Sequence, residues 1–280
     1  MRPSYILTSA AILLATLSVS AESQAPVAPT QLTYADLVDL ALAAPVAVHV
    51  GVRDAVRLRD ERAVGVGPGR TRFYVEADVL SLIRGTQGLP AQVRYLVDLP
   101  NDARGRPPKL REESQFILLA TTVPGRPGEI RLIGPEAQLS YTPQLADRLR
   151  QVLRQAAQAD APPKITGIGR AFHVPGTLPG ESETQIFLET ADNRPVSLTV
   201  LRRPGQAPRW AVALSEIVDN AARPPEPNTL LWYSLACNLP STLPAESVAG
   251  IEPSHAQAIR ADYRVVMEGL GPCARNRGRG

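Results

Sequence analysis

Three segments of alternating apolar and polar residues, joined by tight turns, constrain the fold of the C-terminal half more than any other feature. Apolar side chains take alternate positions at Ile186 and Leu188, at Val196, Leu198 and Val200, and at Trp210, Val212 and Leu214. A period of two is typical of strands with one buried face. The connections 191–194 and 204–206 have the length and composition of hairpin turns. With a preceding strand over 168–174, these segments predict an antiparallel meander.

The N-terminal half shows a different order of elements. Thr33 followed by Asp36 is a capping box that predicts a short helix ending before Pro45. Strand-like segments follow at 46–58, 71–83, 92–99, 115–121 and 129–133, the fourth being the continuous apolar run FILLA expected of a strand buried on both faces. A second helix begins at Pro143 and carries an apolar stripe at helical spacing. Five short strands with a closing helix predict a small Greek-key barrel.

The strand sequences VAVHVGV, VLSLIRG, QVRYLVD and FILLA give residues 34–133 a resemblance to a known family. This part resembles the secreted netrin-like (NTR) and tissue-inhibitor-like OB barrels, which implies an OB-like barrel. The N-terminal half-cystines of that family are absent here, as is any residue that would carry protease inhibition, so the resemblance implies a fold and no activity. The whole chain also resembles an uncharacterised family of exported bacterial proteins.

The first 21 residues have the pattern of a secretory signal peptide. Arg2 precedes the apolar run Ile6–Val19, and the small residues Ser20 and Ala21 offer a cleavage site. The run is shorter than the roughly 20 residues that a membrane-spanning helix requires. We therefore expect a periplasmic or secreted protein with no membrane span after cleavage. In an oxidising compartment the two cysteines of the chain, Cys237 and Cys273, predict one disulfide.

These patterns define an α+β protein with six consecutive parts. We predict a signal peptide (1–21), a disordered leader (22–31), an OB-like barrel domain (32–158), a linker (159–167), a meander domain with two C-terminal helices (168–272) and a basic tail (273–280). We expect the first of the two helices over 230–239. For the second we expect a capping box of Ser254 and Gln257 at its start and Gly269 at its end.

Charge and motifs exclude several functional classes. The formal net charge is +3, and the 30 basic residues are scattered rather than gathered on one face, apart from a cluster of Arg275, Arg277 and Arg279 in the tail, so we expect no nucleic-acid partner. The glycines of 65–69 lack the Lys-Ser/Thr pair and the helix that a phosphate-binding loop requires. We expect no metal and no cofactor.

The loop between His173 and Thr184 is the candidate site, because its prolines and glycines could hold polar side chains at one end of the sheet. Three chemistries are open. Ser182 could act as nucleophile with His173 as base and Asp219 orienting it, although GESET lacks the G-x-S-x-G elbow. Glu181 and Glu183 could act as an acid–base pair, or one of them could hold a metal with His173. The alternative is that the loop has no chemical role and only connects two strands, with His173 on the surface.

Two further groups are candidates for binding. Arg202 and Arg203 could bind an anion or an acidic polymer, and Trp210 could form a sugar-stacking platform with Phe172 and Phe187, or else pack in the core. We therefore expect a non-enzymatic envelope binding or assembly module whose partner is an envelope protein or polysaccharide. The alternative is a hydrolase of cell-envelope material that acts through His173, Glu181 and Glu183.

Overall fold

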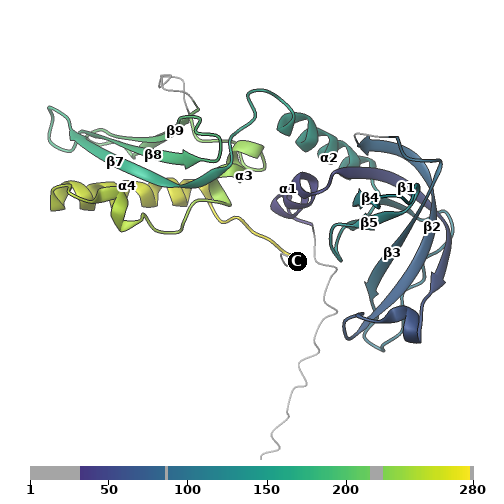
Figure 1. Cartoon of the computed structure of the whole chain (residues 1–280). Helices are drawn as coiled ribbons and strands as arrows, with labels where there is room; N and C mark the ends of the chain where they lie inside the picture. Colours follow the sequence, from purple (N-terminus) through teal and green to yellow (C-terminus); the bar gives the residue numbers. More distant parts are fainter. Residues whose placement is uncertain (1–31, 86–87, 215–222, 278–280) are drawn as a thin grey trace, which may run out of the picture. The chain divides into compact units, whose positions relative to one another are not determined.

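The structure, a computed structural model, describes residues 32–85, 88–214 and 223–277. The predicted signal peptide and leader, Asp219 and the end of the basic tail lie outside the described residues. Contacts group Leu32–Gly280 into one unit. The described part of it is an α+β structure with antiparallel sheets, four α-helices and two 3-10 helices, η1 (Asp60–Ala63) and η2 (Ala245–Val248), which confirms the predicted class (Figure 1).

The first helix, α1 (Tyr34–Ala43), begins where the capping box was predicted. The hydroxyl of Thr33 accepts a hydrogen bond from the Asp36 amide at 3.1 Å, and the Asp36 carboxylate accepts one from the Thr33 amide at 3.1 Å. The apolar face of the helix is buried, with Leu37 and Val38 at most 1% exposed. The helix ends before Pro45, as expected.

The five strands predicted in the N-terminal half are all present, and a sixth joins them. They are β1 (Val46–Arg57), β2 (Arg70–Arg84), β3 (Gln92–Pro100), β4 (Gln115–Thr122), β5 (Ile130–Leu132) and the unpredicted β6 (Gln138–Ser140). The pairing order is β3-β2-β1-β4-β5, with β6 also on β4. The path is open at its ends, where one isolated parallel bridge joins Arg94 of β3 to Glu129 beside β5. The segment Ile117–Ala120 is fully buried because β4 lies inside this sheet.

Helix α2 (Pro143–Ala156) closes this half. Thr142 caps it by accepting a hydrogen bond from the Leu145 amide at 3.1 Å, and Pro143 occupies the first turn, where its missing N–H costs nothing. Ala146, Leu149 and Val152 are buried along one side of the helix. The apolar stripe read from the sequence is therefore its core face.

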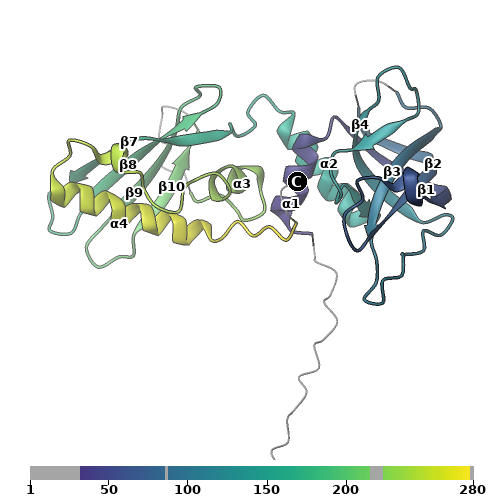
Figure 2. The ribbon, with the colours of Figure 1, turned by 60° about the horizontal axis from the view of Figure 1, so that its bottom comes forward.

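The predicted meander is confirmed as a four-stranded antiparallel sheet of order β10-β9-β8-β7. Its strands are β7 (Ile165–Pro175), β8 (Ser182–Thr190), β9 (Val196–Arg202) and β10 (Arg209–Ala213). The first begins inside the segment expected to be the linker. Helix α4 (Pro253–Leu270) lies along one face of the sheet and contacts β7, β8 and β9 (Figures 1 and 2).

The register of this sheet decides which side chains α4 covers. His173, Thr184, Val200 and Trp210 are partners across the four strands, so their side chains share the face that packs on α4. The neighbouring row, Phe172, Gln185, Thr199 and Ala211, points to the opposite face.

The last two α-helices are joined by the predicted disulfide. Cys237 caps the C-terminus of α3 (Leu230–Ala236), and Cys273 follows the end of α4; their sulfurs are bonded and 36 positions separate them. Such a bond is typical of proteins that fold outside the cytoplasm. None of the described helices is long and apolar enough to cross a membrane.

Both ends of α4 differ from the prediction. The helix begins earlier, because Pro253 takes the first position and Glu252 caps it by accepting from the amides of Ser254 and His255. It also ends later, at Leu270, and the C-cap residue is Gly271, whose φ of +69° suits glycine. Gly269 serves packing instead, because a Cβ there would lie 2.4 Å from Nε1 of Trp210.

The basic tail is held by carboxylates. Arg275 forms an ion pair with Asp39 at 2.5 Å, and Arg277 forms one with Glu136 at 3.4 Å. Arg275 and Arg277 of the basic tail therefore bind side chains of the same chain.

Candidate functional site

The loop predicted as the site does not gather its candidate residues. Glu181 closes the loop on itself, since its carbonyl accepts from the Gly176 amide at 2.8 Å and its carboxylate accepts from the Leu178 amide at 3.4 Å. Glu183 is exposed and belongs to the sheet face opposite to His173. Among the described residues, no hydrogen bond joins the His173 ring to Glu181, Ser182 or Glu183.

His173 instead belongs to a network built around a buried carboxylate that the sequence analysis missed. Asp262, on α4, is fully buried; its Oδ2 accepts from the Thr184 hydroxyl at 2.5 Å and its Oδ1 accepts from Nε of Arg202 at 2.6 Å. The Nδ1 atom of His173 lies 2.8 Å from the same Thr184 oxygen. We call Asp262, Thr184, Arg202 and His173 the Asp262 network.

The network fixes the tautomer of His173. The Thr184 hydroxyl has a single proton, and it donates that proton to Oδ2 of Asp262. The Thr184 oxygen then accepts from His173, which places the ring proton on Nδ1 and leaves Nε2 with its lone pair. Burial lowers the pKa of His173 below its ordinary value of 6.5; Asp262 opposes this, and His255 and Arg202 reinforce it.

Two of the predicted binding residues, Arg202 and Trp210, have partners inside the structure, and the other three are exposed. Arg202 binds Asp262, while Arg203 is exposed at the end of β9. Trp210 is 8% exposed and packs beneath α4, whereas Phe172 and Phe187 are exposed on the other face, where their rings meet edge to face at 6.0 Å. The three aromatic rings therefore form no common platform, because the register of β10 places Trp210 in the core.

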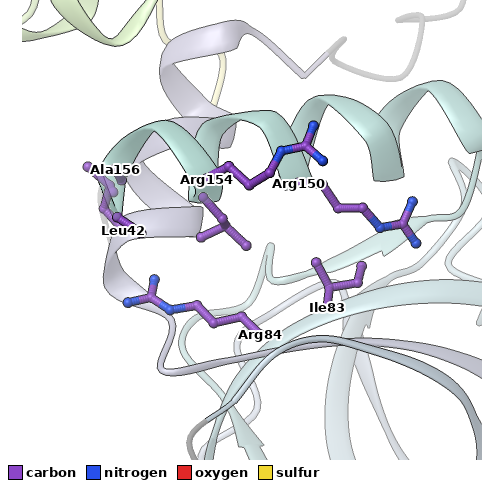
Figure 3. A pocket seen from close by; sticks show the side chains of 8 residues that line it. Leu42, Ile83, Arg84, Arg150, Arg154 and Ala156 are labelled. Atoms are coloured by element: carbon purple, nitrogen blue, oxygen red, sulfur yellow. The ribbon is translucent and has the colours of Figure 1, made fainter. Parts of the chain in front are cut away.

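A second site, in the N-terminal half, combines arginines with an apolar surface. A pocket of about 530 Å³ lies between the end of α1, the end of β2 and the last turns of α2 (Figure 3). We call it the arginine pocket; it is lined by Leu42, Ile83, Arg84, Arg150, Leu153, Arg154, Ala156 and Ala157. Figure 3 shows Arg150 and Arg154 on the helix, Ile83 and Arg84 below it, and Leu42 and Ala156 at one edge; the side chains of Arg84 and Arg150 point in opposite directions.

The three guanidinium groups are held to different degrees. Arg84 donates from Nη1 to the carbonyl of Ala41 at 2.9 Å, in the last turn of α1. Arg150 pairs at 3.0 Å with Asp147, whose side chain is 76% exposed. Arg154 is exposed, in the last turn of α2. None of the lining residues is acidic, so the pocket carries a positive charge above an apolar floor.

Sequence reasoning also missed the arginine pocket, because its residues come from three separated segments and each arginine reads as an ordinary surface charge. Its volume lies in the range of small-molecule sites. Its chemistry suits a ligand with an anionic group attached to a hydrocarbon.

Comparison with known proteins adds no family. No protein-family model matches the chain, and a search of the curated proteins returned no match. The two resemblances stated from the sequence therefore remain predictions, and the function is argued from the sites.

Proposed function

We propose that the protein is a non-enzymatic binding module of the cell envelope and that its ligand is an anionic amphiphile held in the arginine pocket. The observation that carries this proposal is the set of three arginines, Arg84, Arg150 and Arg154, around an apolar floor with no acidic lining residue. Guanidinium groups bind carboxylate and phosphate oxygens through paired hydrogen bonds. A hydrocarbon next to the anionic group would cover Ile83 and Leu153.

Location and fold support a role in the envelope. The sequence of residues 1–21 and the disulfide between Cys237 and Cys273 both favour export to the periplasm or beyond. The strand order β3-β2-β1-β4-β5, with a parallel bridge between its ends, supports an OB-like barrel of the netrin-like kind. OB barrels are a fold used for binding. An envelope protein or polysaccharide partner belongs to the same proposal, since acidic groups on either could occupy the pocket.

The hydrolase alternative has no contact in its favour. It requires His173 within hydrogen-bond reach of Ser182 or an acidic side chain in a pocket. In the described part of the chain the His173 ring forms its hydrogen bond with Thr184, whose side chain is fully buried and inaccessible to a substrate. We therefore propose the binding function alone.

Isothermal titration of the purified protein with dodecyl phosphate, below its micelle concentration, tests the proposal. Dodecyl maltoside controls for the hydrocarbon and inorganic phosphate for the anion. We expect dodecyl phosphate to bind more tightly than either, with an affinity that falls as salt rises because the charges are near the surface.

The matched variants lie on one helix. Arg150→Gln with Arg154→Gln is expected to weaken binding about tenfold, since partly exposed charge pairs contribute about 0.2–1 kcal/mol each and 1.4 kcal/mol is tenfold. Arg148→Gln removes the same charge from α2 outside the pocket lining and should leave the affinity unchanged. Arg84 is left intact because it binds the end of α1. Equal binding of dodecyl maltoside, or an equal loss in Arg148→Gln, would overturn the proposal.

A further inference from the structure

Two of the three histidines of the chain meet at the end of the second sheet. The rings of His173, on β7, and His255, in the first turn of α4, lie with their centroids 5.3 Å apart and their planes inclined by 53°. Both side chains are partly exposed. The pair therefore combines two imidazoles with access from solvent.

The spacing of the rings suits two ligands of one metal ion. A tetrahedral zinc ion with Zn–N bonds of about 2.0–2.1 Å holds the centroids of two ligating imidazoles roughly 5 Å apart, because each centroid lies about 1.1 Å behind its ligating nitrogen. The observed 5.3 Å agrees with this distance.

The Asp262 network supplies the support that metal-binding histidines usually have. Such a histidine donates its second ring N–H to a carboxylate, a carbonyl or another acceptor, which fixes the tautomer and the ring orientation. His173 donates from Nδ1 to the hydroxyl oxygen of Thr184, and the same hydroxyl donates to the carboxylate of Asp262. Its Nε2 is left as the nitrogen for a ligand.

The charges around the pair are compatible with a cation. Arg202 is a positive group whose charge acts on His173, and it forms an ion pair with Asp262 at 2.6 Å. The carboxylate of Glu252 caps the start of α4 beside His255 and opposes the positive end of the helix.

We propose that His173 and His255 form a binding site for a divalent transition-metal ion. No group of three His, Cys, Asp or Glu side chains in the described part of the chain could hold a metal, so the remaining coordination positions belong to water or to a ligand from outside. Imidazole nitrogens suit Zn²⁺, Ni²⁺ and Cu²⁺, and affinities follow the order that ends in Cu²⁺. Mg²⁺ prefers oxygen ligands and should not bind.

Titration of the purified protein with Zn²⁺ and with Cu²⁺, followed by calorimetry and by electron paramagnetic resonance for Cu²⁺, tests the proposal. We expect one ion per chain, two imidazole nitrogens in the Cu²⁺ spectrum and a higher melting temperature in Zn²⁺, because the ion binds the folded state. His173→Gln and His255→Gln should each remove one nitrogen from the spectrum and abolish the rise in melting temperature.

A matched pair of threonine variants tests the supporting role of the network. Thr184→Val removes the acceptor of the His173 N–H and should weaken metal binding about 10- to 100-fold, as loss of such partners does. Thr199→Val makes the same substitution in the same sheet, away from the pair, and should leave the affinity unchanged. Wild-type affinity in the double variant His173→Gln/His255→Gln, or a Cu²⁺ spectrum without two imidazole nitrogens, would overturn the proposal.

Discussion

Replacing Thr184 by valine is expected to destabilise the protein by about 2–3 kcal/mol, although the two side chains have nearly the same shape. The Thr184 hydroxyl donates to the buried carboxylate of Asp262 and accepts from His173. A hydrogen bond to a charged group contributes about 1.5–3 kcal/mol and a neutral one about 0.5–1.5 kcal/mol. The added methyl group returns about 0.8 kcal/mol by burial. Asp262 keeps Arg202 as a partner, so the protein should still fold.

Thr199→Val is the control, because it makes the same change in the same sheet with the opposite expectation. The Thr199 hydroxyl is buried and has no hydrogen-bond partner among the described residues. Removing it relieves a buried unsatisfied group, so this variant should be as stable as the wild type or more stable by about 1 kcal/mol. Urea unfolding measures the change in the free energy of unfolding for each of the two variants, provided that the m-value stays the same as in the wild type. If both variants lost the same stability, the argument from hydrogen bonds would be refuted.

Three further predictions concern the helix contact, the disulfide and pH. Gly269→Ala should lower the free energy of unfolding in the urea assay by about 1–3 kcal/mol, because the new Cβ would overlap Trp210. Gly134→Ala is the control, because a Cβ there meets open space and should change stability little. Equal effects of the two substitutions would contradict the prediction. Replacing both cysteines by serine should lower the free energy of unfolding by about 3–4 kcal/mol, from the chain entropy of a loop of this length, and an unchanged urea midpoint would argue against that role. The pKa of His173 is lowered in the folded state, so the unfolded state binds more protons below pH 6.5 and stability should fall as the pH drops through that value. His173→Gln should lose this slope between about pH 7 and 5, and an identical slope in both proteins would exclude His173 as its source.

The parts of the fold that the sequence predicted are set by neighbours in the chain. The start of α1 depends on Thr33 and Asp36, three positions apart, and the meander depends on alternation within each strand and on short turns. The disulfide followed from there being two cysteines in all. Each of these features can be predicted from the sequence without knowing how the helices and sheets pack together.

The Asp262 network depends on contacts that no local pattern specifies. Thr184 and Asp262 are 78 positions apart and meet only because α4 packs on one face of the sheet. One signal was present: Asp262 interrupts the apolar face of α4 between Ile259 and Tyr263, and an acid there requires a buried partner. The sequence left open whether Trp210 joins an aromatic platform or packs in the core for a similar reason, since the register between β9 and β10 decides its face.

The arginine pocket shows the same limit. Arg84 is the last residue of β2, whereas Arg150 and Arg154 lie on a helix about seventy residues later. In the sequence each is a solvated charge, and they line one pocket because the fold brings the last turns of α2 to the end of β2.

A crystal structure of the protein with dodecyl phosphate bound would test the proposed function most directly. We predict that the phosphate oxygens lie within hydrogen-bond distance of Arg150 and Arg154 and that the hydrocarbon covers Leu153 and Ile83. A ligand bound elsewhere on the protein, with the arginine pocket filled by water alone, would contradict the account.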